Sequence, residues 1–167
     1  MPANPEPSKK DAQREMLRHA VATIAYRGGK ALRGVPENFS RFEAGNGART
    51  PGTILAHICD LFDWALSIAR GKEEWRNSKP QSWDQDVARF HSTLAKFDEV
   101  LASDVKLPVS VESLFQGPIA DALTHIGQIS ILRRIAGGPV RGENYVIAEI
   151  VSGRVGAEQA APKYEFD

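Results

Sequence analysis

Three observations predict that this 167-residue chain is an all-α protein, a four-helix bundle followed by a C-terminal extension. Apolar residues recur every three or four positions in four separate segments, each roughly twenty residues long. Each segment is bounded by residues that start or stop helices. No β-hairpin signal lies between the segments. An antiparallel bundle is the arrangement that buries four such apolar faces together.

The first helix is predicted to begin at Asp11, where apolar residues start to recur at helical spacing, and to fade before Gly34 and Pro36. The preceding segment, residues 1–10, carries three prolines and few apolar side chains. We expect it to be a flexible arm. The bundle is therefore expected to span residues 11–138, and the extension residues 139–167.

The second and third helices have clear start signals. Thr50 is a good N-cap and Pro51 suits the first helical position, so the second helix should run from there to about Arg70. Ser82 can cap the third helix. That helix carries the most regular apolar stripe in the chain, made by Val87, Phe90, Leu94, Phe97 and Leu101.

The fourth helix is predicted to start at Gly117-Pro118 and to end near Arg133-Arg134, whose charges complement the helix dipole at its C-terminus. Residues 140–167 differ in character, with an apolar, partly β-branched stretch from Tyr145 to Val151 followed by repeated Gly and Pro. So much apolar surface should seek cover. We expect this extension to pack on the bundle or across a dimer interface, and to act as a lid if Tyr145 or Glu149 reaches a pocket.

The amino-acid composition argues against several classes of function for this chain. The chain has 21 basic and 21 acidic residues, so its formal charge of zero argues against binding nucleic acid or an acidic membrane surface. Cys59 is the single cysteine, which excludes an internal disulfide and favours a reducing compartment. We expect neither a signal peptide nor a membrane span. The sequence therefore predicts a cytoplasmic protein, and we expect a homodimer.

The spacing of His57, Asp121 and His125 suggests a three-ligand metal centre. Asp121 and His125 lie four positions apart on the predicted fourth helix, so both can bind one ion, and His57 on the second helix would complete the set. Two imidazoles and a carboxylate suit a divalent transition metal and leave a coordination position open. The alternatives are hydrogen-bonded core histidines and, for Asp121, a favourable position in a first helical turn.

Two segments resemble the DinB/YfiT-like superfamily of metalloenzymes, residues 50–58 (TPGTILAHI) and residues 121–134 (DALTHIGQISILRR). In that family a histidine on the second helix and a His-x-x-x-His pair on the fourth bind a divalent metal. The resemblance covers the bundle and implies that His57 and His125 are ligands. Asp121 stands where the family has histidine. A carboxylate there is still a competent ligand, and it shifts the preference toward harder ions.

The resemblance implies a divalent-metal-dependent enzyme, a hydrolase or a thiol-dependent transferase, acting on a small molecule or thiol. Nickel or zinc is the expected ion. No organic cofactor is expected, the catalytic residues are unknown, and Asp60 and Glu143 are the only candidates for a general base. Five further residues could support or line the site, or could instead belong to helix packing and the core: Gln128, Thr53, Trp64, Trp75 and Trp83. The alternative is a non-catalytic bundle that binds a small molecule or dimerises, with a structural metal or none.

Overall fold

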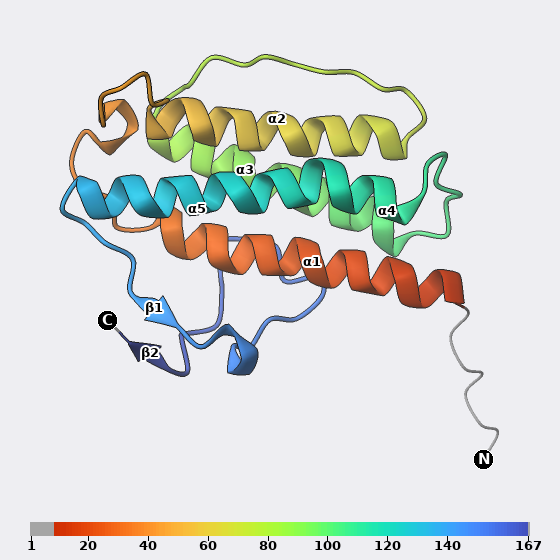
Figure 1. The fold of residues 1–167 in the computed structure, drawn as a ribbon. Coiled ribbons are helices and arrows are strands. Elements are labelled where there is room, and N and C mark those ends of the chain that lie inside the picture. Colours follow the sequence, from red (N-terminus) through yellow and green to blue (C-terminus); the bar gives the residue numbers. More distant parts are fainter. Residues whose placement is uncertain (1–8, 167) are drawn as a thin grey trace.

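Four long helices pack together as an antiparallel bundle, which confirms the predicted fold class (Figure 1). They are α1 (Lys9–Leu32), α2 (Pro51–Ala69), α3 (Trp83–Ala102) and α5 (Ala120–Ile135). A 3-10 turn, η1 (Phe39–Arg41), lies between α1 and α2. The computed structural model describes residues 9–166. The predicted arm therefore lies outside the described residues, except for Lys9 and Lys10, which belong to α1.

The predicted caps form as expected at the second and third helices. The Thr50 hydroxyl accepts a hydrogen bond from the backbone N–H of Thr53 at 3.3 Å, so α2 begins at Pro51. Ser82 forms a capping box with Gln85, in which each side chain bonds the other residue's backbone N–H. Both boundaries are set by contacts within one helical turn.

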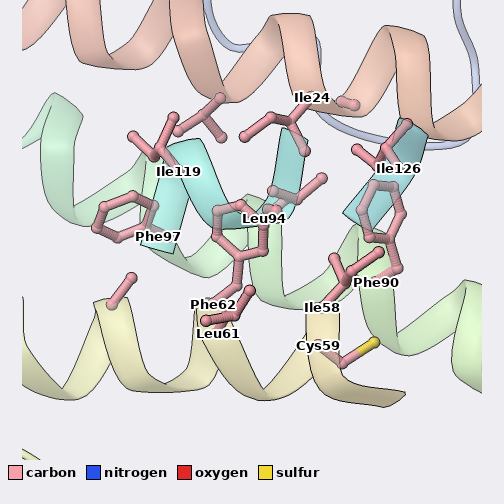
Figure 2. Packing of buried hydrophobic residues seen from close by; sticks show 14 of the residues in the cluster. Ile24, Ile58, Cys59, Leu61, Phe62, Phe90, Leu94, Phe97, Ile119 and Ile126 are labelled. Atoms are coloured by element: carbon pink, nitrogen blue, oxygen red, sulfur yellow. The ribbon is translucent and has the colours of Figure 1, made fainter. Parts of the chain in front are cut away.

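The core lies between the four helices and is filled largely by aromatic and β- or γ-branched side chains (Figure 2). Phe62 of α2 and Phe97 of α3 meet with ring centroids 6.1 Å apart, and both are fully buried. Phe90 and Leu94 from the predicted stripe of α3 are equally buried. Burial of this kind contributes about 25 cal/mol per Å² of apolar surface and is the main source of the bundle's stability.

The fourth helix begins earlier than predicted. Helical structure starts at α4 (Val111–Leu114), which Ser110 caps, and passes through the π-helical turn η2 (Phe115–Ile119) into α5. The prediction of a start at Gly117-Pro118 was therefore wrong. Pro118 lacks an N–H and would clash with the carbonyl four residues earlier in an α-helix. The π turn relieves this conflict, since Ala120 N–H bonds to the Phe115 carbonyl, five residues back.

The C-terminal extension lies beside α1, on the side of the bundle away from α2 (Figure 1). Its strands β1 (Gly142–Glu143) and β2 (Glu165–Phe166) pair antiparallel, and the short 3-10 turn η3 (Tyr145–Ile147) follows β1. Glu143 is buried, where it accepts hydrogen bonds from the Tyr26 hydroxyl at 2.6 Å and the Lys30 ammonium at 2.7 Å. Burial and this bond to Glu143 raise the pKa of the Tyr26 hydroxyl.

Apolar surface does not account for how the extension is attached. Val155 is the fully enclosed apolar residue of the segment and joins the main core, and its carbonyl lies 3.1 Å from the His91 ring. Val146, by contrast, is 93% exposed. The expectation that the Tyr145–Val151 stretch would be covered was wrong for this residue, because the buried Glu143 carboxylate provides the anchor instead.

Among the described residues, α2 has the length and apolar composition that a membrane span needs, contrary to the expectation that no segment would. In the structure, 67% of that window is buried inside the bundle. The burial agrees with its position, since α2 packs against both α3 and α5.

Candidate metal centre

The structure brings His57, Asp121 and His125 together from two neighbouring helices. His57 lies in the second turn of α2, while Asp121 and His125 lie one turn apart on α5. The prediction that the second and fourth helices are neighbours is confirmed. The two imidazole rings meet edge to face, with centroids 4.7 Å apart.

The ligand atoms are spaced closely enough to share one ion. The two Asp121 oxygens lie 3.6 Å from His57 Nε2 and 3.4 Å from His125 Nε2. One ligand atom from each residue falls within 4.8 Å of the others. Donor atoms about 2.0–2.2 Å from a tetrahedral ion stand roughly 3.3 Å apart. The two carboxylate spacings are near that value, and the remaining spacing, between the two imidazole nitrogens, is no greater than 4.8 Å.

The site is partly enclosed. The side chains of His57 and His125 are 22% and 12% exposed, whereas Asp121 is 47% exposed. The Trp75 indole covers one edge of His57, with ring centroids 5.6 Å apart. Two imidazoles are thus held in the protein while the carboxylate faces solvent, which leaves room for a water molecule or a ligand at the same point.

Gln128 supports His125 through its other ring nitrogen. His125 Nδ1 lies 2.8 Å from Gln128 Oε1, and an amide oxygen accepts hydrogen bonds only. His125 Nδ1 must therefore carry the proton, and the lone pair of Nε2 faces Asp121. Histidines that bind metals are oriented by this kind of bond at the second nitrogen.

Burial also keeps His57 in the form that binds metals. Its pKa is lowered chiefly by loss of hydration, and the neighbouring His125 lowers it further, while Asp121 acts in the opposite direction. A neutral imidazole is the form that can donate its lone pair to an ion. The environment therefore favours the ligand over the imidazolium at neutral pH.

The early start of the fourth helix removes one explanation for the presence of a carboxylate at position 121. A carboxylate in a first helical turn would be favoured by the helix dipole alone. Helical structure instead begins at Val111, so Asp121 lies well inside a continuous helical segment and not at its N-terminus. No general helix-end effect accounts for a half-exposed carboxylate between two histidines.

A pocket of about 720 Å³ opens from the three residues along the groove between α2 and α5. Its remaining walls combine apolar side chains with two polar ones, and they comprise Ala44, Ala48, Arg49, Ile54, Gln128, Ile131, Leu132 and Ile135. Small-molecule sites commonly fall between about 300 and 1,000 Å³. The size and the mixed lining suit a small organic molecule placed next to the ion site.

Two residues considered as general bases lie elsewhere. Asp60 is buried and accepts hydrogen bonds from the Ser78 N–H and hydroxyl and pairs with Arg89 at 2.6 Å, so it fastens the loop between α2 and α3. Glu143 is buried against α1, as described above. Neither residue lines the pocket. Neither candidate lies at the pocket, because long-range ion pairs hold these carboxylates elsewhere.

Cys59, Trp83 and Thr53 take no part in the site, whereas Trp75 covers His57 as described above. Cys59 is buried, and burial raises the pKa of its thiol. Trp83 packs on Phe39 and donates to the Leu32 carbonyl, so it belongs to the core. Thr53 bonds only within the α2 cap. The extension contributes no residue to the pocket lining, which rules out the lid suggested for it.

Sequence reasoning missed Arg49, Ile131 and Ile135, which line the pocket. Ile131 and Ile135 continue the face of α5 that carries Gln128, and helical spacing could have found them. Arg49 precedes the α2 cap in a connecting segment, where no periodic signal exists. Only the tertiary structure places this segment beside the C-terminal half of α5.

Comparison of the chain with family models, with curated proteins and with solved structures finds no match.

Proposed function

We propose that this chain is a divalent-metal protein of the DinB/YfiT type in which His57, Asp121 and His125 hold a nickel or zinc ion. The observation that carries the proposal is the convergence of these three ligand atoms from α2 and α5 on one point. Two neutral nitrogens and one carboxylate form a donor set that both ions accept. The bond between His125 and Gln128 adds support, since it directs Nε2 toward that point.

We propose further that the centre is that of an enzyme, a hydrolase or a thiol-dependent transferase. A divalent ion with an open position lowers the pKa of a coordinated water or thiol and so supplies a nucleophile at neutral pH. The chain's own residues orient the ligands, partly exclude water and provide the adjoining pocket for a small molecule. These features support hydrolysis or transfer equally.

The test is the metal content of protein purified without a histidine tag, measured by mass spectrometry. We expect about one nickel or zinc ion per chain, and its loss in His57→Ala and His125→Ala with the fold retained, because the core supplies the stability. His19→Ala, on the exposed surface of α1, is the matched control and should keep the ion. Stoichiometric metal in both ligand variants would contradict the assignment.

A second candidate, a non-catalytic bundle that binds a small molecule, is favoured by one observation. Among the residues that line the pocket, Asp121 is the only carboxylate, and the proposal already uses it as a ligand. No separate general base is present there. Turnover of an activated ester, or conjugation of a thiol, by the metal-loaded protein but not by His125→Ala would favour the enzyme. Metal binding without turnover would favour the second candidate.

A further inference from the structure

The pocket is chemically divided along its length. His57, Asp121 and His125 form one end, and the apolar side chains of α5 continue from Leu132 to Ile135, about 15 Å beyond His125 at 1.5 Å per residue. The antiparallel helix α2 shows the same order, since Ile54 lies one turn from His57 in that direction. A ligand lying in the groove would therefore meet polar groups first and apolar walls after them.

A single cation, Arg49, lies on the pocket wall near the N-terminus of α2. Arg49 precedes the Thr50 cap, and α2 begins roughly 9 Å from His57 along the helix axis. Within the part of the chain that the structure describes, Arg49 has no hydrogen-bonded or ion-paired partner. A guanidinium on a pocket wall without a carboxylate partner can bind an anionic ligand through two parallel hydrogen bonds.

Part of the apolar wall is exposed to solvent. The side chains of Ile131 and Ile135 are 63% and 58% exposed, although both line the pocket. Leu132 and Ile54, which complete this wall, are buried. An apolar ligand body lying along the groove would remove the two isoleucines from water, which is favourable. The cation and the apolar wall thus select different parts of the same molecule.

We propose that the pocket binds a small carboxylate with an apolar body, whose carboxylate is held by Arg49 beside the N-terminus of α2. This inference rests on the proposed function in one respect, namely that the reacting group of the ligand would lie at the metal site. Arg49 acts as the residue that determines specificity for an anion, and it takes no part in the chemistry.

The first test uses metal-free, tag-free protein with hexanoate and hexanol, which differ in charge and share an apolar chain. In a ligand-observed NMR titration we expect hexanoate to bind about tenfold more tightly, as one charge-assisted contact allows. Arg49→Gln should remove this preference, and Arg49→Glu should reverse it in favour of hexylammonium. Arg41→Gln removes an exposed arginine from the same connecting segment, outside the pocket lining, and should leave the preference intact.

The second test uses zinc-loaded protein with octanohydroxamate and its analogue with a terminal carboxylate, since a hydroxamate binds zinc. The added carboxylate should improve affinity about tenfold in the unaltered protein and not in Arg49→Gln. Equal affinities of charged and neutral probes, or an equal effect of Arg41→Gln, would overturn the role of Arg49. Zinc binding would then still stand. If no variant bound the hydroxamate, the result would count against the metal centre. The metal-free titration alone would then test whether Arg49 binds the carboxylate.

Discussion

His125 shows how one hydrogen bond prepares a candidate ligand. Its Nδ1 proton is held by Gln128, so the tautomer with a free Nε2 is the one that fits this environment. A histidine without such a bond would divide its time between two tautomers and several ring orientations. The pair lies within one turn of α5, so its geometry does not depend on the rest of the pocket.

We predict that Gln128→Leu lowers zinc affinity about 10-fold to 100-fold, the usual effect of removing such a supporting bond. Gln128→Glu keeps an acceptor for the Nδ1 proton and should retain most of the affinity. Competition with a chelating dye measures both variants. Gln81→Leu, at an exposed glutamine before α3, serves as the control. Unchanged affinity in Gln128→Leu would show that the bond does not orient the ligand.

Two glycines inside helices should respond oppositely to the same substitution. A Cβ at Gly28 would lie 2.6 Å from the ring of the fully buried Phe90, whereas a Cβ at Gly127 would meet no atom within 4 Å. Alanine in an open helical position stabilises by about 0.5–1 kcal/mol. We therefore predict that Gly127→Ala raises the free energy of unfolding by this amount. Gly28→Ala should lower it by about 1–3 kcal/mol through overpacking.

Urea denaturation of the two alanine variants in parallel measures both effects. Because the intrinsic gain in helix propensity is shared, the difference between the two variants reports the close contacts at Gly28, with Phe90 and, at 3.2 Å, with Ile126. A stabilising Gly28→Ala would mean that α1 and α3 can move apart at this point.

At the scale of elements, the π turn at η2 changes the helical phase with which the chain enters α5. It accommodates one residue more than an α-helical turn, so the direction of Asp121 cannot be counted from Val111 by α-helical periodicity. A Cβ at Gly117 would lie 3.7 Å from the Trp64 indole, an ordinary van der Waals contact, so the indole packs against this turn without requiring a glycine. The π turn thus lies within two turns of Asp121 and His125 on the same helical segment, whereas the third candidate ligand, His57, lies on α2.

The contact between the extension and α3 should make stability depend on pH through His91. Burial lowers the pKa of His91 in the folded protein, although its bond to the Val155 carbonyl acts the other way. The unfolded chain therefore takes up the proton first as pH falls through about 6.5. The contribution of the buried, neutral His91 to the free energy of unfolding is therefore present above that pH and is lost below it.

We predict that His91→Gln gives a shallower loss of unfolding free energy between pH 7.5 and 5.5 than the unaltered protein, measured by urea denaturation without metal. Some slope should remain, because the pKa of His57 is lowered as well. His19→Gln, at an exposed position, is the control and should follow the unaltered profile. Parallel profiles for His91→Gln and the unaltered protein would contradict the assignment.

At the scale of the whole molecule, the candidate centre and the extension occupy different faces. The pocket lies between α2 and α5. The extension lies beside α1 (Figure 1), and Glu143 and Val155 attach it to α1 and α3. A ligand can therefore enter the groove without displacing the extension. Metal binding should stabilise the bundle by joining two helices that are far apart in the sequence.

We predict that zinc at 100 times its Kd raises the Tm by about 5–10 °C, since such an excess adds about 2.7 kcal/mol and a domain of this size gains about 2–4 °C per kcal/mol. Differential scanning calorimetry with and without a chelator measures the shift. The double variant His57→Ala/His125→Ala should show none. An equal shift in the double variant would place the stabilising ion elsewhere.

The sequence by itself determined the features that depend on neighbours within one or two helical turns. The caps at Thr50 and Ser82, the apolar stripe of α3 and the four-residue spacing of Asp121 and His125 were all predictable, because a helix converts sequence distance directly into direction. That His57 belongs to the same group followed from the pairing of polar positions on two predicted helices.

Tertiary structure alone decided the features that join distant residues. Arg133 was expected to complement the dipole of its own helix, but it is buried and donates to the Ala31, Arg33 and Gly34 carbonyls at the end of α1. Glu143 bonds Tyr26 across 117 positions, and Arg49 enters the pocket from a segment without periodicity. No local pattern encodes these contacts. Each depends on which charged groups remain near one another once the apolar faces have packed.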